Sequence, residues 1–158
     1  MNRQWERIKA SERAAAADET GAEAPKSALD GISRSLPALA ASQEMQERAA
    51  HIGYDWPSID GVLDKVHEEV LELVEAEDQA HRAEELGDLL FVLVNVGRWT
   101  GIEVEGALRA ANEKFRRRFR HVELAAATRG VALRDLSFEE LDALWDAAKA
   151  FERGEASA

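Results

Sequence analysis

The chain has 158 residues, a net charge of −11 and no cysteine. Its length suffices for one domain with a sizeable core, and the lack of cysteine excludes disulfides, thiolate metal sites and cysteine nucleophiles. The acidic excess disfavours contact with nucleic acid and anionic membranes. No apolar run approaches the roughly 20 residues of a membrane span, and the N-terminus lacks a signal-peptide pattern. We therefore expect a cytoplasmic protein that binds neither nucleic acid nor membrane.

An all-α fold is predicted, because alanine, leucine and glutamate dominate and no proline follows position 57. Residues 1–34 show little periodicity and are expected to form a mobile or partly helical arm. A helical domain is expected over 35–152, and 153–158 should be a disordered tail. Helices are predicted over 35–52 with Ser35 as N-cap, over 58–77, 82–99 and 104–128, and from Ser137, where Glu140 completes a capping box, to about 151.

Two acid pairs stand out in consecutive predicted helices. In DKVHEEVLELVEAE, a helical wheel places Glu69 nearest the interior and Glu72 one turn further on. The next helix, AEELGDLLFVLVNVGRW, is apolar nearly all round, as a central buried helix would be, and Glu85, Asp88 and Asn95 share one stripe of it. A buried carboxylate is costly unless it is paired or binds a metal. Antiparallel packing of the two helices would bring the pairs Glu69/Glu72 and Glu85/Asp88 together. Four converging carboxylates need cations to balance their charge, and oxygen ligands favour Mg²⁺ or Mn²⁺. For the glutamates alone, a solvated helix face is the alternative.

The segment NEKFRRRFRH carries five basic residues between positions 114 and 120. The wheel puts Lys114 and Arg118 beside the apolar stripe, where they can reach a site at the edge of the core. A carboxylate-bound metal that faces them is complementary to a polyphosphate. Arg116, Arg117 and Arg120 point away, which fits a solvated face or a subunit contact better than a nucleic-acid footprint.

Taken in order, these motifs resemble the MazG family of nucleoside triphosphate pyrophosphohydrolases. The matching stretches are GYDWPSIDGVLDKV, E-E-x-x-E at 68–72, E-E-L-G-D at 84–88, LLFVLVNVGR, ANEKFRRRF and LDALWDAAK. The resemblance spans nearly the whole chain and is to a stand-alone equivalent of the C-terminal half of long MazG proteins. It implies an all-α bundle whose four-helix active site is completed by dimerisation. The predicted helix over 82–99 is also apolar on more sides than one small bundle can cover, so we expect a homodimer or a dimer of dimers. The resemblance also implies Mg²⁺-dependent hydrolysis of (deoxy)nucleoside triphosphates to the monophosphate and pyrophosphate, in nucleotide-pool house-cleaning.

The resemblance also assigns roles residue by residue. It implies four catalytic metal ligands, Glu69, Glu72, Glu85 and Asp88. The candidate substrate-binding residues are Lys65, Asn95, Asn112, Lys114, Arg118, Trp145 and Lys149. Trp145 also lies on a plain apolar stripe that suits a core residue. Lys65 and Asn95 have alternatives too, as a surface lysine and as a buried amide bonded to a neighbouring helix.

Three other interpretations remain open. A dUTP/dUDP-type hydrolase or a phosphoribosyl-ATP pyrophosphohydrolase of the same superfamily would share the chemistry and differ in the base pocket. A carboxylate di-iron bundle would need Glu-x-x-His pairs, whereas this chain has Asp64-Lys-Val-His67 and Asp78-Gln-Ala-His81, with His81 in a predicted turn. A non-catalytic helical dimer would use the acids for solubility, and Asp88 in a buried helix argues against it.

Overall fold

The computed structural model describes residues 26–154, and all regular structure in this range is helical. The elements are α2 (Ala38–His51), α3 (Ile59–Glu75), α4 (Gln79–Trp99), α5 (Val104–Thr128), the short 3₁₀ helix η1 (Leu133–Asp135) and α6 (Phe138–Glu152). The predicted all-α fold is confirmed. Residues 1–25 of the predicted arm and residues 155–158 of the predicted tail lie outside the described range.

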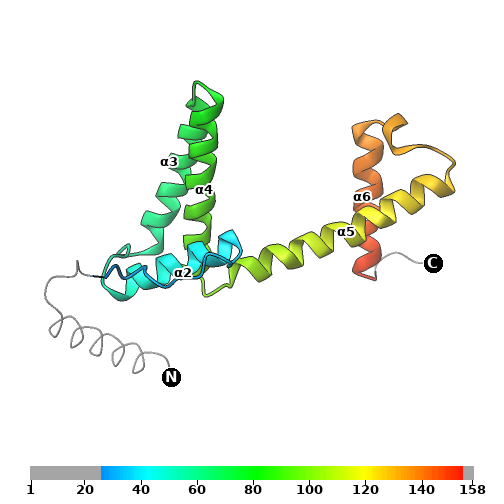
Figure 1. The fold of residues 1–158 in the computed structure, drawn as a ribbon. Coiled ribbons are helices and arrows are strands. Elements are labelled where there is room, and N and C mark those ends of the chain that lie inside the picture. The colour runs from blue at the N-terminus through cyan, green and yellow to red at the C-terminus, as the bar shows by residue number, and fades with distance from the viewer. Residues whose placement is uncertain (1–25, 155–158) are drawn as a thin grey trace, which may run out of the picture.

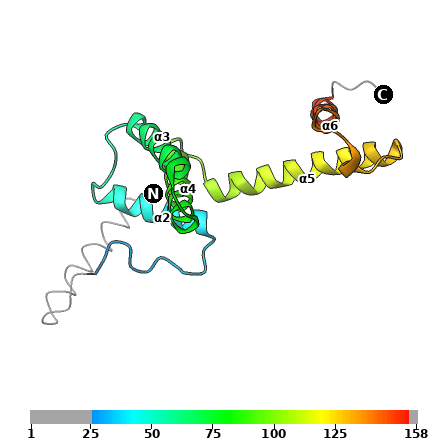
Figure 2. The same cartoon turned by 90° about the horizontal axis from the view of Figure 1, so that it is seen from above.

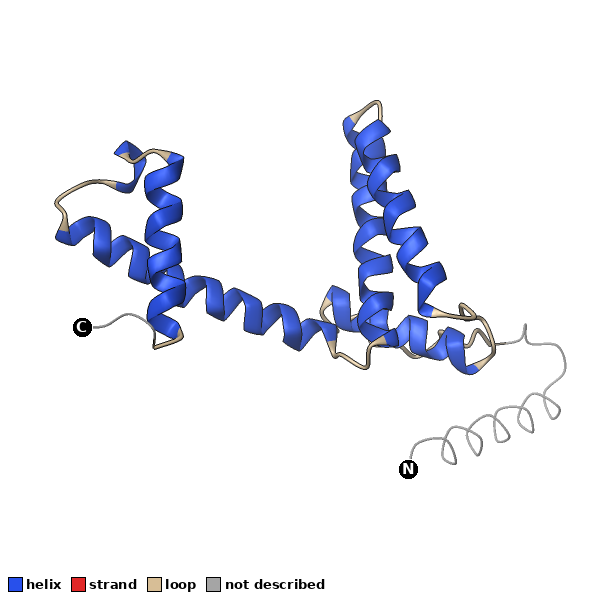
Figure 3. Ribbon diagram, turned by 180° about the vertical axis from the view of Figure 1, so that it is seen from behind, coloured by secondary structure: helices blue, strands red, loops and turns tan. Residues whose placement is uncertain are grey.

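The helices form two packed groups that one long helix connects (Figure 1). α3 and α4 make an antiparallel hairpin, and α2 lies across its base, in contact with α4 and with the start of α5. α5 then runs away from the hairpin, and α6 packs against its far half (Figures 2 and 3). The acid-bearing hairpin and the arginine-bearing part of α5 therefore lie apart within one chain.

Local sequence signals set most of the helix ends. α6 begins after Ser137 with the predicted capping box, and α5 has the predicted bounds. The predicted Ser35 cap is wrong: α2 begins at Ala38 with Pro37 as its N-cap. Because a residue that precedes proline avoids the α region, Leu36 cannot belong to the helix. At the other end of α2, Gly53 takes a φ of 92°, which only glycine adopts easily, and the chain turns there as predicted.

The buried residues lie in two separate places. Val122, Ala126, Leu144 and Ala148 form the core between α5 and α6, whereas Val62 and Val94 are buried within the α2–α3–α4 group. In the single chain α4 is not buried on most sides, because four of its large apolar residues are 42–48% exposed: Leu86, Leu90, Phe91 and Leu93. Within residues 26–154, the main contacts that cover this helix come from α2, α3 and the start of α5.

The joint between α4 and α5 depends on a glycine. A Cβ at Gly97 would overlap the Val104 side chain, whereas a Cβ at Gly87, also in α4, would meet nothing within 4 Å. We expect Gly97→Ala to lower the free energy of unfolding by about 1–3 kcal/mol through overpacking. Gly87→Ala, the matched control, should leave it unchanged or raise it by up to about 1 kcal/mol. Urea unfolding followed by circular dichroism measures both, and equal stabilities would contradict the close approach.

Candidate metal centre

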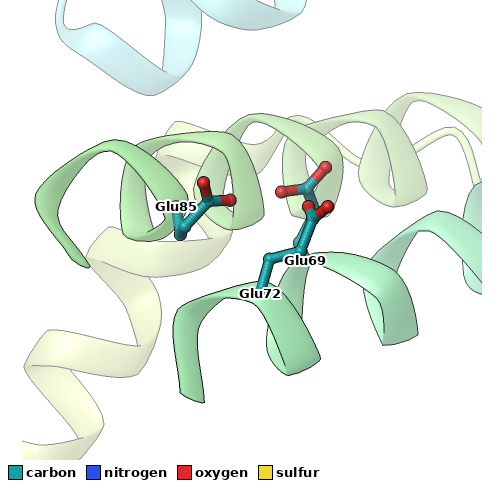
Figure 4. Close-up of side chains that lie close together, drawn as sticks. All are labelled: Glu69, Glu72 and Glu85. Atoms are coloured by element: carbon teal, nitrogen blue, oxygen red, sulfur yellow. The ribbon is translucent and has the colours of Figure 1, made fainter. Parts of the chain in front are cut away.

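Three of the four predicted acids come together at the upper half of the α3–α4 hairpin. Glu69 and Glu72 lie one turn apart on α3, so they share a face of that helix. α4 runs antiparallel beside it and brings Glu85 opposite them. Each of the three offers a carboxylate oxygen, and these oxygens all lie within 4.8 Å of one another (Figure 4). The spacing allows one divalent cation to contact all three.

Glu69 is the inner acid of this cluster, as the wheel predicts, and its side chain is 4% exposed. Its Oε1 lies 2.7 Å from the Lys65 Nζ. Its Oε2 is buried and has no hydrogen-bond partner among the described residues. A buried carboxylate oxygen without a partner is costly, and a divalent cation would satisfy it. The residues therefore fit a hard cation with oxygen ligands, such as Mg²⁺ or Mn²⁺.

The charges around the cluster perturb its ionisation. The pKa of the Glu72 carboxyl is raised above its ordinary value, mainly by desolvation and further by the nearby Glu85 and Glu69 carboxylates, while Lys65 opposes the shift. The pKa of Lys65 is raised by its hydrogen bonds to Glu68 and Glu69, so this lysine stays protonated. The cluster therefore holds more negative charge than one ammonium group can balance.

Lys65 acts as a resident counter-ion of these acids. Its Nζ lies 2.8 Å from the Glu68 Oε1 as well as 2.7 Å from Glu69. The sequence analysis gives this residue as a candidate for substrate binding, and the structure adds its pairing with the acids.

Because a cation at the cluster must share Glu69 with this ammonium, Lys65→Met is expected to tighten Mg²⁺ binding by about tenfold. Calorimetry on the metal alone measures the change. Lys26→Met removes the same charge away from the cluster and should change the affinity by less than about twofold. Weaker binding in Lys65→Met would show that the lysine orients Glu69 for the metal instead of competing with it.

His81 is a neighbour of the cluster that the sequence analysis places in a turn. α4 begins three residues earlier than predicted, because the Asp78 side chain accepts a hydrogen bond from the His81 backbone N–H and caps the helix. His81 therefore lies in the first turn of α4, and its Nε2 is 3.1 Å from the Glu85 Oε1. A side chain that forms a hydrogen bond or ion pair with a metal ligand can fix the orientation of that ligand. The preference of aspartate for the N-cap was the signal that could have found this.

Asp88, the fourth predicted acid, is exposed and does not belong to the three-residue cluster. The prediction of a buried carboxylate at this position is wrong for the single chain. The physical reason is the uncovered surface of α4, where Leu86 and Leu90 are also exposed. Its assignment as a metal ligand stays a prediction.

The predicted cationic residues gather elsewhere, on α5 and α6. Arg118 has a side chain that is 21% exposed, against 77% for Arg116, and its Nε donates to the Glu152 Oε2 at 2.7 Å. This hydrogen bond lowers the pKa of Glu152. The guanidinium also lies 5.9 Å from the centre of the Trp145 ring. Arg118 thus sits at the edge of the core, as predicted, while Arg116 faces water.

The remaining substrate-binding candidates have varied settings. Trp145 packs against the α5–α6 core, with its ring 5.2 Å from the ring of Phe115. Lys149 forms an ion pair with Asp146 on its own helix. Asn112 and Lys114 are exposed on α5. One chain therefore does not bring these residues to the acidic cluster, because α5 runs away from the hairpin (Figures 1 and 2).

Asn95 belongs to a network that anchors the loop before α3. The Arg98 Nε donates to the Asn95 Oδ1 at 2.9 Å, and the same guanidinium binds both carboxylate oxygens of Asp55. These hydrogen bonds hold the pKa of Asp55 below its ordinary value. Asn95 is therefore bonded within its own helix and, among the helices that the structure describes, not to a neighbouring one. The Asp55–Arg98 pair joins residues far apart in sequence, and no local pattern indicates it.

The helical hairpin with its clustered acids lies in a segment that is similar to a known protein family. Residues 61–123 match a family model described as "MazG nucleotide pyrophosphohydrolase domain". This stretch includes the whole acidic cluster and Arg118. The resemblance to the MazG family is therefore confirmed, and it includes a direct match of this segment to the domain of that family.

The similar proteins point the same way. The chain is 46% identical over 150 residues to the nucleoside triphosphate pyrophosphohydrolase of Escherichia coli K12. This alignment covers 92% of the present chain and 54% of the Escherichia coli protein. It is 39% identical over 147 residues to the Thermotoga maritima nucleoside triphosphate pyrophosphohydrolase/pyrophosphatase MazG, again over 93% of the chain and 54% of the relative. A Bacillus subtilis protein, YabN, is 49% identical over 79 residues. The chain thus spans about half the length of the first two relatives.

None of the described helices is both long and apolar enough to cross a membrane.

Proposed function

We propose that this chain hydrolyses nucleoside or deoxynucleoside triphosphates to the monophosphate and pyrophosphate with Mg²⁺, as nucleotide-pool house-cleaning. The observation that carries the proposal is the cluster of Glu69, Glu72 and Glu85 inside the MazG-matching segment, with a buried Glu69 oxygen that has no partner in the described part of the chain. The printed activities of the Escherichia coli and Thermotoga maritima relatives support it.

Each side chain has a role in this reaction. Glu69, Glu72 and Glu85 would hold Mg²⁺, with Asp88 as the predicted fourth ligand, and the bound ion would supply charge neutralisation of the phosphates and a more acidic water. The sequence offers no Ser/His/Asp or Cys/His arrangement, so water is the proposed nucleophile. Glu69 or Glu72 orients that water or accepts its proton.

The cationic residues complete the proposed site. Lys114 and Arg118 stabilise the charge that develops on the transferring phosphoryl group. Asn112, Trp145 and Lys149 are proposed to hold the nucleotide from α5 and α6. Because these residues lie away from the acids of their own chain, we propose that a second copy brings them to the cluster.

A homodimer or a dimer of dimers is the proposed assembly. Its support is the uncovered apolar surface of the hairpin, where the large side chains of α3 and α4 are exposed in the single chain: Leu63, Val70, Leu71, Val74, Leu86, Leu90 and Leu93. Such a surface marks a contact with another protein surface. A monomer in sedimentation equilibrium at micromolar concentration would contradict this assembly.

A panel of canonical and damaged deoxynucleoside triphosphates, extended by dUDP and phosphoribosyl-ATP, tests the reaction with Mg²⁺. The expected products are the monophosphate and pyrophosphate, separated by ion-exchange chromatography. Turnover confined to dUTP and dUDP, or to phosphoribosyl-ATP, would select one of the two sibling activities. Metal binding without any turnover would favour the non-catalytic dimer. Iron in the coloured, purified protein would favour the di-iron interpretation.

A further inference from the structure

Glu152 is an acidic residue beside the cationic and aromatic side chains that are proposed to hold the nucleotide. It is the last residue of α6, the helix that packs across α5 (Figure 1). The proposed reaction gives this residue no role. A carboxylate close to a phosphate-binding residue also repels a triphosphate. The contacts of Glu152 show what this carboxylate does there.

The place of Glu152 within α6 is unfavourable on electrostatic grounds. A negative charge in the last turn of a helix lies at the negative end of the helix dipole. The other charged residues at the ends of α6 follow the favourable pattern, with Glu139 and Glu140 in the first turn and Lys149 in the last turn. Contacts with α5 compensate for the charge of Glu152.

Two arginines of α5 supply these contacts. The Arg118 Nε donates to the Glu152 Oε2 at 2.7 Å, and the Arg117 Nε donates to the Oε1 at 3.3 Å. The Arg118 side chain is 21% exposed, against 63% for Arg117. A short, partly shielded, charge-assisted hydrogen bond is strong, whereas a long and exposed one is weak. Glu152 therefore acts mainly on Arg118.

The edge of the guanidinium that Glu152 binds decides what the rest of this group can do. A guanidinium carries five N–H donors in a rigid plane, and the bond to Glu152 uses the Nε edge. The two Nη groups of Arg118 form no hydrogen bond with the residues that the structure describes. The Arg118 Cζ also lies over the Trp145 ring, 5.9 Å from its centre. Arg118 is thus held by Glu152 and Trp145, and its pair of Nη groups stays available for a second anion.

We infer that Glu152 is the positioning residue of Arg118: it accepts from the Nε and thereby directs the two Nη groups toward the phosphates. This inference rests on the proposed function, in which Arg118 stabilises the transferring phosphoryl group. The planar fork of an arginine binds two phosphate oxygens only in a suitable orientation. A carboxylate that fixes this orientation before the substrate binds reduces the freedom that the long side chain loses on binding. Because Glu152 holds the edge away from the Nη pair, its repulsion of the phosphates is weakened by distance.

Replacement of Glu152 by two different side chains tests this role. Glu152→Ala removes the acceptor and is expected to lower kcat/KM for the most active deoxynucleoside triphosphate of the panel by about tenfold, because the fork loses its orientation. Glu152→Gln keeps an acceptor oxygen at the same reach without the charge and should stay within about threefold of the unmodified protein. Glu123→Ala removes an exposed acid from α5 and is the matched control, with a change below about twofold. Circular dichroism should show the same helix content in all three variants.

A double-mutant cycle separates positioning from a purely structural role. If Glu152 acts through Arg118, Glu152→Ala should change kcat/KM by less than about twofold in a protein that already carries Arg118→Ala. If Glu152 only stabilises the packing of α6 on α5, the two substitutions act independently and their effects multiply. Multiplied effects would overturn the positioning role.

Two further results would also overturn it. A Glu152→Gln variant as weak as Glu152→Ala would show that the charge matters and not the hydrogen bond to the Nε. A Glu152→Ala variant with higher activity than the unmodified protein would show that Glu152 competes with the substrate for the guanidinium.

Failure of this inference is distinguishable from failure of the proposed function. If triphosphates are hydrolysed and Glu152→Ala keeps its full kcat/KM, the function stands and the inference is wrong. If hydrolysis is absent, the proposed function is wrong, and calorimetry with inorganic triphosphate and Mg²⁺ tests the inference instead. An affinity about tenfold lower in Glu152→Ala would then support it. An unchanged affinity, or no binding by the unmodified protein, would overturn it.

Discussion

Glu69→Gln is expected to lower Mg²⁺-dependent turnover at least about a hundredfold, because it removes the charge of the most buried acid in the cluster. Glutamine has the same shape, so the packing of α3 against α4 is retained. The amide nitrogen cannot bind a cation, and the Oε2 position, which has no partner within residues 26–154, becomes part of a neutral group. Initial rates, Mg²⁺ titration by calorimetry and circular dichroism separate lost metal binding from lost folding.

Glu75→Gln is the matched control for this variant. Glu75 is exposed on the same helix and does not belong to the cluster, so its removal should change turnover by less than about twofold. Glu72→Ala and Asp88→Ala are expected to abolish turnover with intact helix content, the second because of the predicted ligand role. Full activity in Glu69→Gln or Glu72→Ala would remove the metal-centre assignment. Full activity in Asp88→Ala alone would limit the ligands to three.

Features that depend on neighbouring residues were predictable from the sequence. The bounds of α5, the capping box at Ser137 and the turn at Gly53 all follow from local signals. The convergence of Glu69, Glu72 and Glu85 was also predictable, because the i, i+3 spacing and a short connection between antiparallel helices fix it. A local sequence pattern predicts a feature when the interactions that cause the feature lie between neighbouring residues.

Features that depend on distant contacts were not predictable in the same way. A hydrophobic pattern shows that α4 avoids water, but it does not show which molecule covers it, so the burial of Asp88 was wrongly predicted for one chain. The pairing of Asp55 with Arg98 and of Gln46 with the Phe91 carbonyl joins elements more than 40 residues apart. The start of α4 is a different kind of miss, because the Asp78 N-cap that places His81 in the helix is a local signal that was overlooked.

Arg118→Ala is expected to lower turnover by about 30- to 1,000-fold, whereas Arg116→Ala should change it by less than about threefold. The difference follows from position, because the Arg118 guanidinium is partly buried between Glu152 and Trp145 and the Arg116 side chain faces water. A charge-assisted bond to phosphate is strong in such a partly desolvated place. Arg117 also contacts Glu152, at 3.3 Å, and is far more exposed. A defect confined to Arg117→Ala would mean that α5 presents position 117, and not position 118, to the phosphates in the assembly.

A mixing experiment with two inactive variants has the largest expected effect, because activity should return from almost none. If each site takes its acids from one copy and Arg118 from another, a mixed dimer of Glu69→Gln and Arg118→Ala contains one doubly defective site and one intact site. Half of the dimers are mixed after free exchange, so about a quarter of the unmodified activity per site is expected. Two affinity tags and co-expression allow the mixed dimer to be purified and assayed.

The control pair for this experiment is Glu69→Gln with Glu72→Gln. Both substitutions lie in the acidic half of the site, so every site of their mixed dimer has a defective cluster and no activity should return. Recovery in the first pair and not in the second requires that acids and arginine come from different copies. It would explain why α5 carries Arg118 away from the hairpin of its own chain (Figure 1). No recovery in either pair, with mixed dimers shown to be present, would mean that each chain builds its whole site alone, and α5 would then have to fold back toward α3 and α4.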